Sequence, residues 1–355
     1  MGEPLSFGTN LIIFMLYPLR MTPIYQTAIW GGRKLETFLG RKLPEGDSFA
    51  ESWDVSSHPR GVNIVQNGPL AGQSIQNIFD NYREELLGPH ANSKLARFPL
   101  MVKFLDANRQ LSVQVHPNEE YVKKNNLSDS AKSEAWVVLQ VAPGSQLTLG
   151  FQHPVTREDV ENALKNDELE SILFKREPLN GECYFLPAGT VHSLGAGIFL
   201  YEIQQCSDLT FRLYDWNRED AHGKKRELHV RQALESLKPE LWNSGPITPQ
   251  LLGEGRELLV ESQTFCLERL TFGETDCVDE KGQKPGPSPN QHWVNTSRSC
   301  HVLTVIRGEL KVEGLESPML QGESVILPAS LGKIKLSSVS AVVLAAYLPE
   351  GDSQP

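Results

Sequence analysis

The chain has 355 residues, a length that predicts two domains. Its 39% hydrophobic and 22% charged residues are typical of a globular protein and argue against long disordered segments. Because 34 Lys and Arg stand against 44 Asp and Glu, the formal net charge is −10. We therefore expect neither a general nucleic-acid binder nor a protein that binds anionic membranes.

The cysteines predict a reducing environment. There are five of them, an odd number, and no CxxC pair occurs, so the sequence indicates neither a disulfide framework nor a thiolate zinc site. We therefore expect a cytoplasmic protein.

An apolar stretch near the N-terminus resembles the hydrophobic part of a signal peptide. Residues 11–19 read LIIFMLYPL, but this run is too short to span a bilayer, contains Pro18 and has no Lys or Arg before it. We expect residues 1–20 to be a dispensable N-terminal extension and the fold to begin at Met21.

Residues 21–240 predict a β-domain with inserted helices, because short apolar runs alternate there with Gly, Pro and Asn. Apolar residues at helical spacing predict helices at 74–87, 156–174 and 226–237. The predicted strands are 111–115, 135–141, 146–150, 183–186 and 198–206.

Residues 238–255 are rich in Pro and Gly and predict a linker. Beyond it the pattern is almost purely β, and we expect a second domain over residues 255–350. Its predicted strands are 258–260, 266–271, 300–307, 309–312, 324–327 and 341–347.

A faint repeat relates the two halves of the chain. Residues 181–192, GECYFLPAGTVH, have the form GxxxxxPxGxxH, and residues 322–330, GESVILPAS, keep the GxxxxxPx spacing without a following His. Both resemble the strand–turn–strand corner of a double-stranded β-helix, the cupin barrel. We therefore predict a mainly β protein with tandem cupin barrels and a few inserted helices, and a metal in the first barrel only.

The segment LSVQVHP, residues 111–117, alternates apolar and polar residues. On a barrel strand, Ser112, Gln114 and His116 would share the face that points into the lumen. The alternative is a half-exposed strand whose polar side chains face water.

Further polar groups follow this strand. Lys132 and Glu134 enter an apolar strand together, although they could equally be surface charges. His192 comes after the Pro-Ala-Gly corner, where it could also be a loop histidine with ordinary partners. Two His, a Glu and a Gln would suit a borderline divalent ion such as Zn²⁺.

The segment YEIQQCSDLTFR places Glu202, Asp208 and Arg212 on one side of an extended chain. Arg212 and Lys132 could supply positive charge to an anionic substrate, and either acid could carry protons. An internal ion-pair network is the alternative.

The ordered motifs QVHP, KSEAW, GECYFLPAGTVHSLGAG and YEIQQCSDLTFRLYDWNR resemble the type I mannose-6-phosphate (phosphomannose) isomerases in their short bacterial form. IWGG, ESWDVSSHP and RELH add to the resemblance. It covers roughly residues 22–350 and is specific up to about residue 235.

The resemblance implies roles for the residues at matching positions. The zinc ligands would be Gln114, His116, Glu134 and His192. Arg212 matches the arginine assigned as catalytic. The substrate-binding positions would be Ser112, Lys132, Glu202 and Asp208.

From this resemblance we expect a zinc-dependent aldose–ketose isomerase that interconverts mannose 6-phosphate and fructose 6-phosphate through an enediol. Arg212 would steady the developing negative charge, while Glu202, Asp208, Lys132 and a water on the metal all stay open as the base. The alternatives are a non-catalytic sugar-phosphate-binding cupin and a cupin metal oxygenase. We expect one zinc per chain, a small sugar phosphate as the partner, and a monomer or a weak homo-oligomer.

Overall fold

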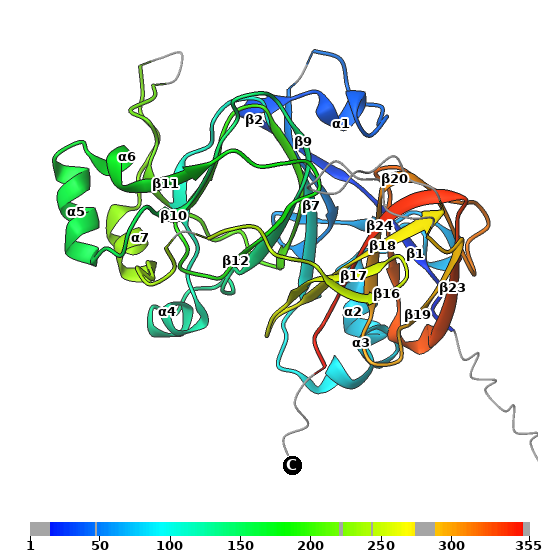
Figure 1. Ribbon diagram of the computed structural model, residues 1–355. Helices are drawn as coiled ribbons and strands as arrows, with labels where there is room; N and C mark the ends of the chain where they lie inside the picture. The colour runs from blue at the N-terminus through cyan, green and yellow to red at the C-terminus, as the bar shows by residue number, and fades with distance from the viewer. Residues whose placement is uncertain (1–14, 47, 220–222, 243, 274–287, 351–355) are drawn as a thin grey trace, which may run out of the picture.

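Strands dominate the structure, as the sequence predicts. The computed structural model describes residues 15–46, 48–219, 223–242, 244–273 and 288–350. Figure 1 shows the strands in two groups, one built mainly from the first half of the chain and the other from the second half.

The first group is a barrel of two antiparallel sheets. Among the described residues one sheet has the order β12 (Cys183–Leu186), β9 (Glu134–Val141), β14 (Ile198–Gln205), β7 (Leu100–Ala107), β3 (Phe49–Val55) and β2 (Ile24–Gly32). The other has the order β11 (Leu173–Arg176), β10 (Leu147–Phe151), β13 (His192–Leu194), β8 (Val113–Val115) and β15 (Phe211–Tyr214). Side chains from both sheets, such as Trp136 and Leu149, share one buried cluster. The sheets therefore face each other, as in a cupin barrel.

The second group, the second barrel, is one large antiparallel sheet whose strands enclose a buried cluster of their own. Among the described residues its path is β16 (Gln250–Gly253), β17 (Arg256–Glu261), β18 (Cys266–Gly273), β24 (Ser340–Tyr347), β20 (His301–Val312), β22 (Ser324–Leu327), β1 (Leu19–Thr22) and β6 (Ile64–Val65). Off this path lie β19 (Gln291–Asn295), β21 (Met319–Leu320) and β23 (Lys333–Ser337). The strands predicted at 300–307 and 309–312 are one long strand, β20, which pairs with β24 along much of its length.

The helices are shorter than predicted. The helix expected at 74–87 is α2 (Ile75–Asn81) and α3 (Arg83–Leu87), and the one at 226–237 is α7 (Val230–Ser236). The helix expected at 156–174 begins as predicted, with a Thr156 capping box on α5 (Arg157–Lys165), but α6 (Leu169–Ile172) is separate. Asp167 lies between them with φ +60°, which breaks the helix.

The remaining short elements are α1 (Lys34–Thr37), α4 (Glu119–Lys124), β4 (Ser57–His58), β5 (Gly61–Val62) and the 3₁₀ turns at Gly68–Leu70, Gly88–Asn92 and Ala329–Leu331.

The predicted repeat corresponds to two similar corners. Gly181 and Gly322 both have positive φ, +88° and +83°, and each precedes a strand that is followed directly by a proline. Gly189 in the first corner also has positive φ, and a Cβ there would meet Lys238 Cγ at 2.7 Å. Only glycine fits that position, whereas the second corner has Ser330 in a 3₁₀ turn.

The end of the expected N-terminal extension packs into the fold. Leu19 is fully buried and lies opposite Ile326 of β22, and Leu16 belongs to the same buried cluster. Arg20 pairs with Glu323 at 2.5 Å. The expected boundary at Met21 therefore falls inside β1, while residues 1–14 lie outside the described residues.

Two remaining expectations concern cysteines and membranes. Cys183, Cys206, Cys266 and Cys300 are free, whereas Cys277 lies outside the described residues. No helix among the described residues is long and apolar enough to cross a membrane.

Candidate metal centre and substrate pocket

Three of the predicted ligands meet inside the first barrel. Nε2 of His116 lies 3.3 Å from Glu134 Oε2, and Nε2 of His192 lies 3.4 Å from Glu134 Oε1. All three side chains are buried, and their ligand atoms lie within 4.8 Å of one another. Glu134 comes from the first sheet, whereas His192 and the residues just before His116 come from the second.

The backbone sets the orientation of both imidazoles. Nδ1 of His116 donates to the carbonyl of Leu209 at 2.8 Å, and Nδ1 of His192 donates to the carbonyl of Thr190 at 3.0 Å. In the neutral ring, a protonated Nδ1 leaves Nε2 with a lone pair. Both lone pairs therefore face the Glu134 carboxylate.

The charge state of the cluster fits a cation. Burial, and then the charge of Lys132, lower the pKa of His116 to about 3, and burial lowers the pKa of His192. Burial disfavours ionisation of Glu134, but Lys132 and the two imidazoles hold its pKa well below the usual value. Among the described residues, both Nε2 atoms and Oε1 of Glu134 are buried without a hydrogen-bond donor, whereas Oε2 of Glu134 has the Lys132 ammonium 3.0 Å away. A divalent cation would satisfy the three acceptors that lack a partner.

Gln114 lies on the second sheet, level with His192 and Arg212 on the neighbouring strands. It is directly opposite His192 on β13 and opposite Arg212 on β15. Side chains that face each other across neighbouring strands lie on one face of the sheet. Gln114, which is half-buried, therefore lies between His192 of the candidate metal centre and Arg212, the predicted catalytic arginine.

A pocket of about 380 Å³ contains the other predicted site residues. Its lining includes Ser112, Gln114, Lys132, Glu202, Asp208 and Arg212. Lys132 joins the pocket to the cluster, because its Nζ lies 3.0 Å from Glu134 Oε2. Burial opposes the charge on Lys132, but Glu134 and Glu202 raise its pKa, so the ammonium stays charged.

The pocket also contains charged residues that the sequence analysis missed. Lys103 Nζ lies 3.3 Å from Glu51, 3.9 Å from Glu202 and 4.7 Å from the ring centre of Trp53. Arg60 and Arg226 complete the cationic side chains of the lining. Glu51 and Trp53 lie in the ESWDVSSHP motif and Arg226 in RELH, so these family-like motifs were the available signal.

Glu202 is the buried acid of the pocket. It lies opposite Lys103 on β7 and Trp136 on β9, and its Oε2 accepts from Trp136 Nε1 at 2.9 Å. Burial, and then the charge of Glu134, raise the pKa of Glu202 to about 7. A carboxyl group in this range can both take and return a proton near neutral pH.

Asp208 and Arg212 stand in more open surroundings. The carboxylate of Asp208 pairs with the Arg60 guanidinium. Arg212 is half-buried, and its Nη1 donates to the carbonyl of Glu227 at 2.9 Å. Burial, and then the charge of Arg226, lower the pKa of Arg212.

Comparisons with known proteins identify the family of the chain. A family model described as the catalytic domain of type I phosphomannose isomerase matches residues 18–135. The mannose-6-phosphate isomerase of Streptococcus mutans is 35% identical over 254 residues, which are 71% of this chain and 78% of that protein. The mannose-6-phosphate isomerase ManA of Bacillus subtilis is 29% identical over 330 residues, covering 92% of this chain and 98% of that protein.

The fold is also that of a solved relative. The crystal structure of the mannose 6-phosphate isomerase from Bacillus subtilis superposes with a TM-score of 0.80 at 25% identity, covering 94% of this chain and 100% of that chain. The likeness therefore extends over both barrels. From the ordered motifs, the shared fold and these identities, the chain belongs to the type I phosphomannose isomerase family of aldose–ketose isomerases.

Proposed function

We propose that the protein is a zinc-dependent isomerase that interconverts mannose 6-phosphate and fructose 6-phosphate through an enediol. The observation that carries the proposal is a buried group of four acceptor atoms, on two imidazoles and one carboxylate, beside a cationic pocket. Family membership supports the reaction and the substrate class.

The donor set favours zinc. His116 and His192 offer neutral imidazole nitrogens and Glu134 offers a carboxylate, which is a common combination for Zn²⁺ with a position left open. We propose Gln114 as a fourth ligand, because it lies beside His192 on the same face. When bound, the ion would polarise a sugar carbonyl or hydroxyl as a Lewis acid.

Among the residues of the chain, Glu202 is best suited to move the proton between C1 and C2. Its carboxyl group is buried at the pocket wall with a pKa raised to about 7. Lys132 stays protonated beside Glu134, and the carboxylate of Asp208 is held by Arg60. These two residues would therefore bind and orient substrate rather than take a proton from carbon.

The cations of the pocket suit the negative charge of substrate and intermediate. Five cationic and three acidic side chains line the pocket, although the whole chain carries a net charge of −10. Arg212 would stabilise the enediolate by a fixed charge. Arg226, beside it, would bind the phosphate dianion with a charge-assisted hydrogen bond.

A coupled assay of mannose 6-phosphate conversion, run with metal analysis, tests the proposal. We expect one zinc per chain, loss of turnover when a chelator removes it, and recovery when zinc is returned. Full activity in metal-free protein would contradict zinc dependence, and absence of turnover by zinc-loaded protein would contradict the isomerase assignment.

The same assay separates the alternatives. A metal oxygenase would need oxygen and redox-active iron, so unchanged turnover under anaerobic conditions excludes it. A non-catalytic sugar-phosphate-binding protein would bind mannose 6-phosphate in a calorimeter and leave it unconverted.

A further inference from the structure

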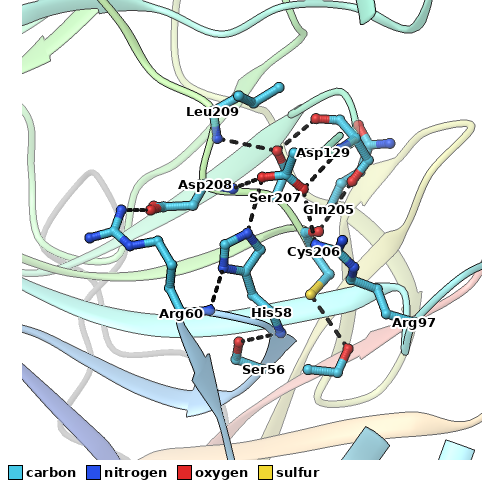
Figure 2. Close-up of polar contacts among 12 residues, drawn as sticks. Ser56, His58, Arg60, Arg97, Asp129, Gln205, Cys206, Ser207, Asp208 and Leu209 are labelled. Atoms are coloured by element: carbon cyan, nitrogen blue, oxygen red, sulfur yellow. Dashed lines mark hydrogen bonds and ion pairs between the residues drawn. The ribbon is translucent and has the colours of Figure 1, made fainter. Parts of the chain in front are cut away.

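Asp129 lies outside the pocket lining, in the segment between α4 and β9, yet it gathers partners from distant parts of the chain. Its carboxylate accepts from His58 Nε2 and Arg97 Nη1, each at 3.0 Å, and from the backbone N–H of Asp208 at 2.9 Å (Figure 2). It also accepts from the N–H of Ser130 at 2.9 Å. Burial disfavours the charge, but His58 and the backbone N–H groups of Asp208 and Ser130 lower the pKa of Asp129 to about 2.

These contacts hold the turn at residues 206–210, which joins β14 to β15. Besides the Asp208 N–H, Ser207 Oγ donates to the carbonyl of Ser130 at 2.6 Å, and Ser130 Oγ donates to the carbonyl of Cys206 at 3.1 Å. Three hydrogen bonds thus tie the loop at 129–130 to the turn. The strands on either side carry Glu202 and Arg212.

The turn contributes directly to both parts of the site. The carbonyl of Leu209 accepts from His116 Nδ1 at 2.8 Å and so leaves the Nε2 lone pair directed at Glu134. Asp208, the preceding residue, lines the pocket. A shift of this turn would therefore change the orientation of the imidazole and the shape of the pocket together.

His58 connects the Asp129 carboxylate, through Arg60, to the side chain of Asp208. Its Nδ1 accepts from the backbone N–H of Arg60 at 3.3 Å, and its Nε2 donates to Asp129 (Figure 2). The side chain of Arg60 then pairs with Asp208. Asp129, Asp208, Arg60 and His58 thus form a closed ring of contacts.

We propose that Asp129 is a positioning residue of the active site. It fixes the 206–210 turn so that the Leu209 carbonyl orients His116 for metal and Asp208 faces the substrate. Its expected effect on activity rests on the proposed function, whereas its effect on His116 can be measured without any reaction. A residue that served stability alone would leave both metal affinity and the state of the His116 ring unchanged.

The test replaces Asp129 by Asn, which keeps the size of the side chain but removes its charge and one acceptor. Replacing groups that orient metal-bound histidines typically costs about 10–100-fold in metal affinity. We expect a loss of that size in the competition of Asp129→Asn with a chelator for zinc, together with reduced kcat. In metal-free protein, NMR should show a weakened or lost His116 Nδ1–H hydrogen bond.

Glu268→Gln provides the matched control, because Glu268 is a buried acid that pairs with Arg256 at 2.6 Å in the second barrel. It should lower the temperature of unfolding without changing zinc affinity. Ser207→Ala provides a second variant should Asp129→Asn fail to fold, since it removes the hydrogen bonds of Ser207 Oγ to Ser130 and from Leu209. It should shift zinc affinity in the same direction by a smaller factor.

Zinc affinity within twofold of wild type in folded Asp129→Asn or, failing that variant, Ser207→Ala would overturn the proposal. So would an unchanged His116 Nδ1–H signal in the metal-free protein. These results are independent of the isomerase assay, so a wrong reaction assignment would leave them interpretable.

Discussion

Lys132 holds its ammonium 3.0 Å from Oε2 of Glu134, the carboxylate that faces both imidazoles of the candidate metal centre. Both side chains are buried, so each compensates the charge of the other where water cannot. A bound cation would compete with Lys132 for the same carboxylate. Lys132 therefore affects the stability of the candidate metal centre as well as the charge of the pocket.

This relationship predicts how Lys132→Met changes stability. Removing one partner of a buried ion pair typically costs about 3–5 kcal/mol, because the other charge is left uncompensated. We expect a loss of this order in the free energy of unfolding of the metal-free protein, and a smaller loss in zinc-saturated protein, where the cation compensates Glu134. Denaturant unfolding with and without zinc measures the difference, and equal losses would contradict it.

Arg212 is expected to affect turnover far more than metal content. It lies across from Gln114 at the pocket, and a guanidinium stays charged at any working pH. Removing a comparable electrostatic group costs about 10²–10³ in kcat, so Arg212→Ala should lose turnover by that factor and keep its zinc. Arg212→Lys should recover part of it, while His192→Ala should lose metal and activity together. Near wild-type turnover of Arg212→Ala would contradict the catalytic assignment.

Arg226 is expected to affect substrate affinity. It lines the pocket beside Arg212, and hydrogen bonds to charged groups contribute about 1.5–3 kcal/mol, or roughly 10–100-fold in binding. Arg226→Ala should therefore raise KM for mannose 6-phosphate by about that factor and change kcat much less. Arg231→Ala, whose side chain on α7 is 84% exposed, is the matched control. A change confined to kcat would place Arg226 outside phosphate binding.

The raised pKa of Glu202 predicts the pH dependence of the reaction. Burial disfavours its carboxylate and gives a pKa of about 7 without metal, and a bound cation nearby would lower that value. Because the base must be ionised, kcat/KM should rise with pH along a limb whose midpoint is no higher than about 7. The pH profile of zinc-loaded enzyme measures it, and activity that falls as pH rises through 7 would exclude Glu202 as the base.

The stability linked to Glu202 should have the opposite dependence on pH. Its pKa in the folded protein lies above the usual value of 4.5 for a Glu side chain, so its contribution to stability is present below about 4.5 and is lost as pH rises through about 7. Glu202→Gln, in metal-free protein, should therefore flatten the fall in unfolding free energy over this window. Wild-type and variant unfolding at pH 5 and pH 8 give the comparison.

The residues of the candidate metal centre could be singled out in the sequence because their signals are local. Gln114 and His116 are two residues apart on one strand, and Glu134 and His192 each belong to a recognisable motif. Their meeting point depends on the pairing of distant strands, which the family resemblance supplied. The repeated corner at Gly181 and Gly322 likewise reflects a backbone requirement that is visible in the residues.

Other site residues carry no local signal. Lys103 is the single charged residue within the apolar run LMVKFL, and only pairing of β7 with β14 and β3 places it between Glu202 and Trp53. Asp129 belongs to the polar segment NNLSDS, where nothing in the sequence distinguishes it from a solvated loop residue. Its role comes from partners that are 71, 32 and 79 residues away in the chain.

The N-terminal boundary shows the same limitation, and it gives the last prediction. The motif LYPLR has no regular amphipathic period, yet Leu19 is completely buried in the core that the two barrels share, on a strand that pairs with β22. Replacing a buried leucine by alanine costs about 2–5 kcal/mol, so Leu19→Ala should lower the unfolding free energy by that amount. Met15→Ala, at a side chain that is 72% exposed, should change it little.

A chain that starts at Met21 should then be less stable than Leu19→Ala, because it also loses Leu16 and the Arg20–Glu323 ion pair. Denaturant unfolding of the three proteins checks the order, and a Met21 chain as stable as the full chain would restore the expectation that residues 1–20 are dispensable.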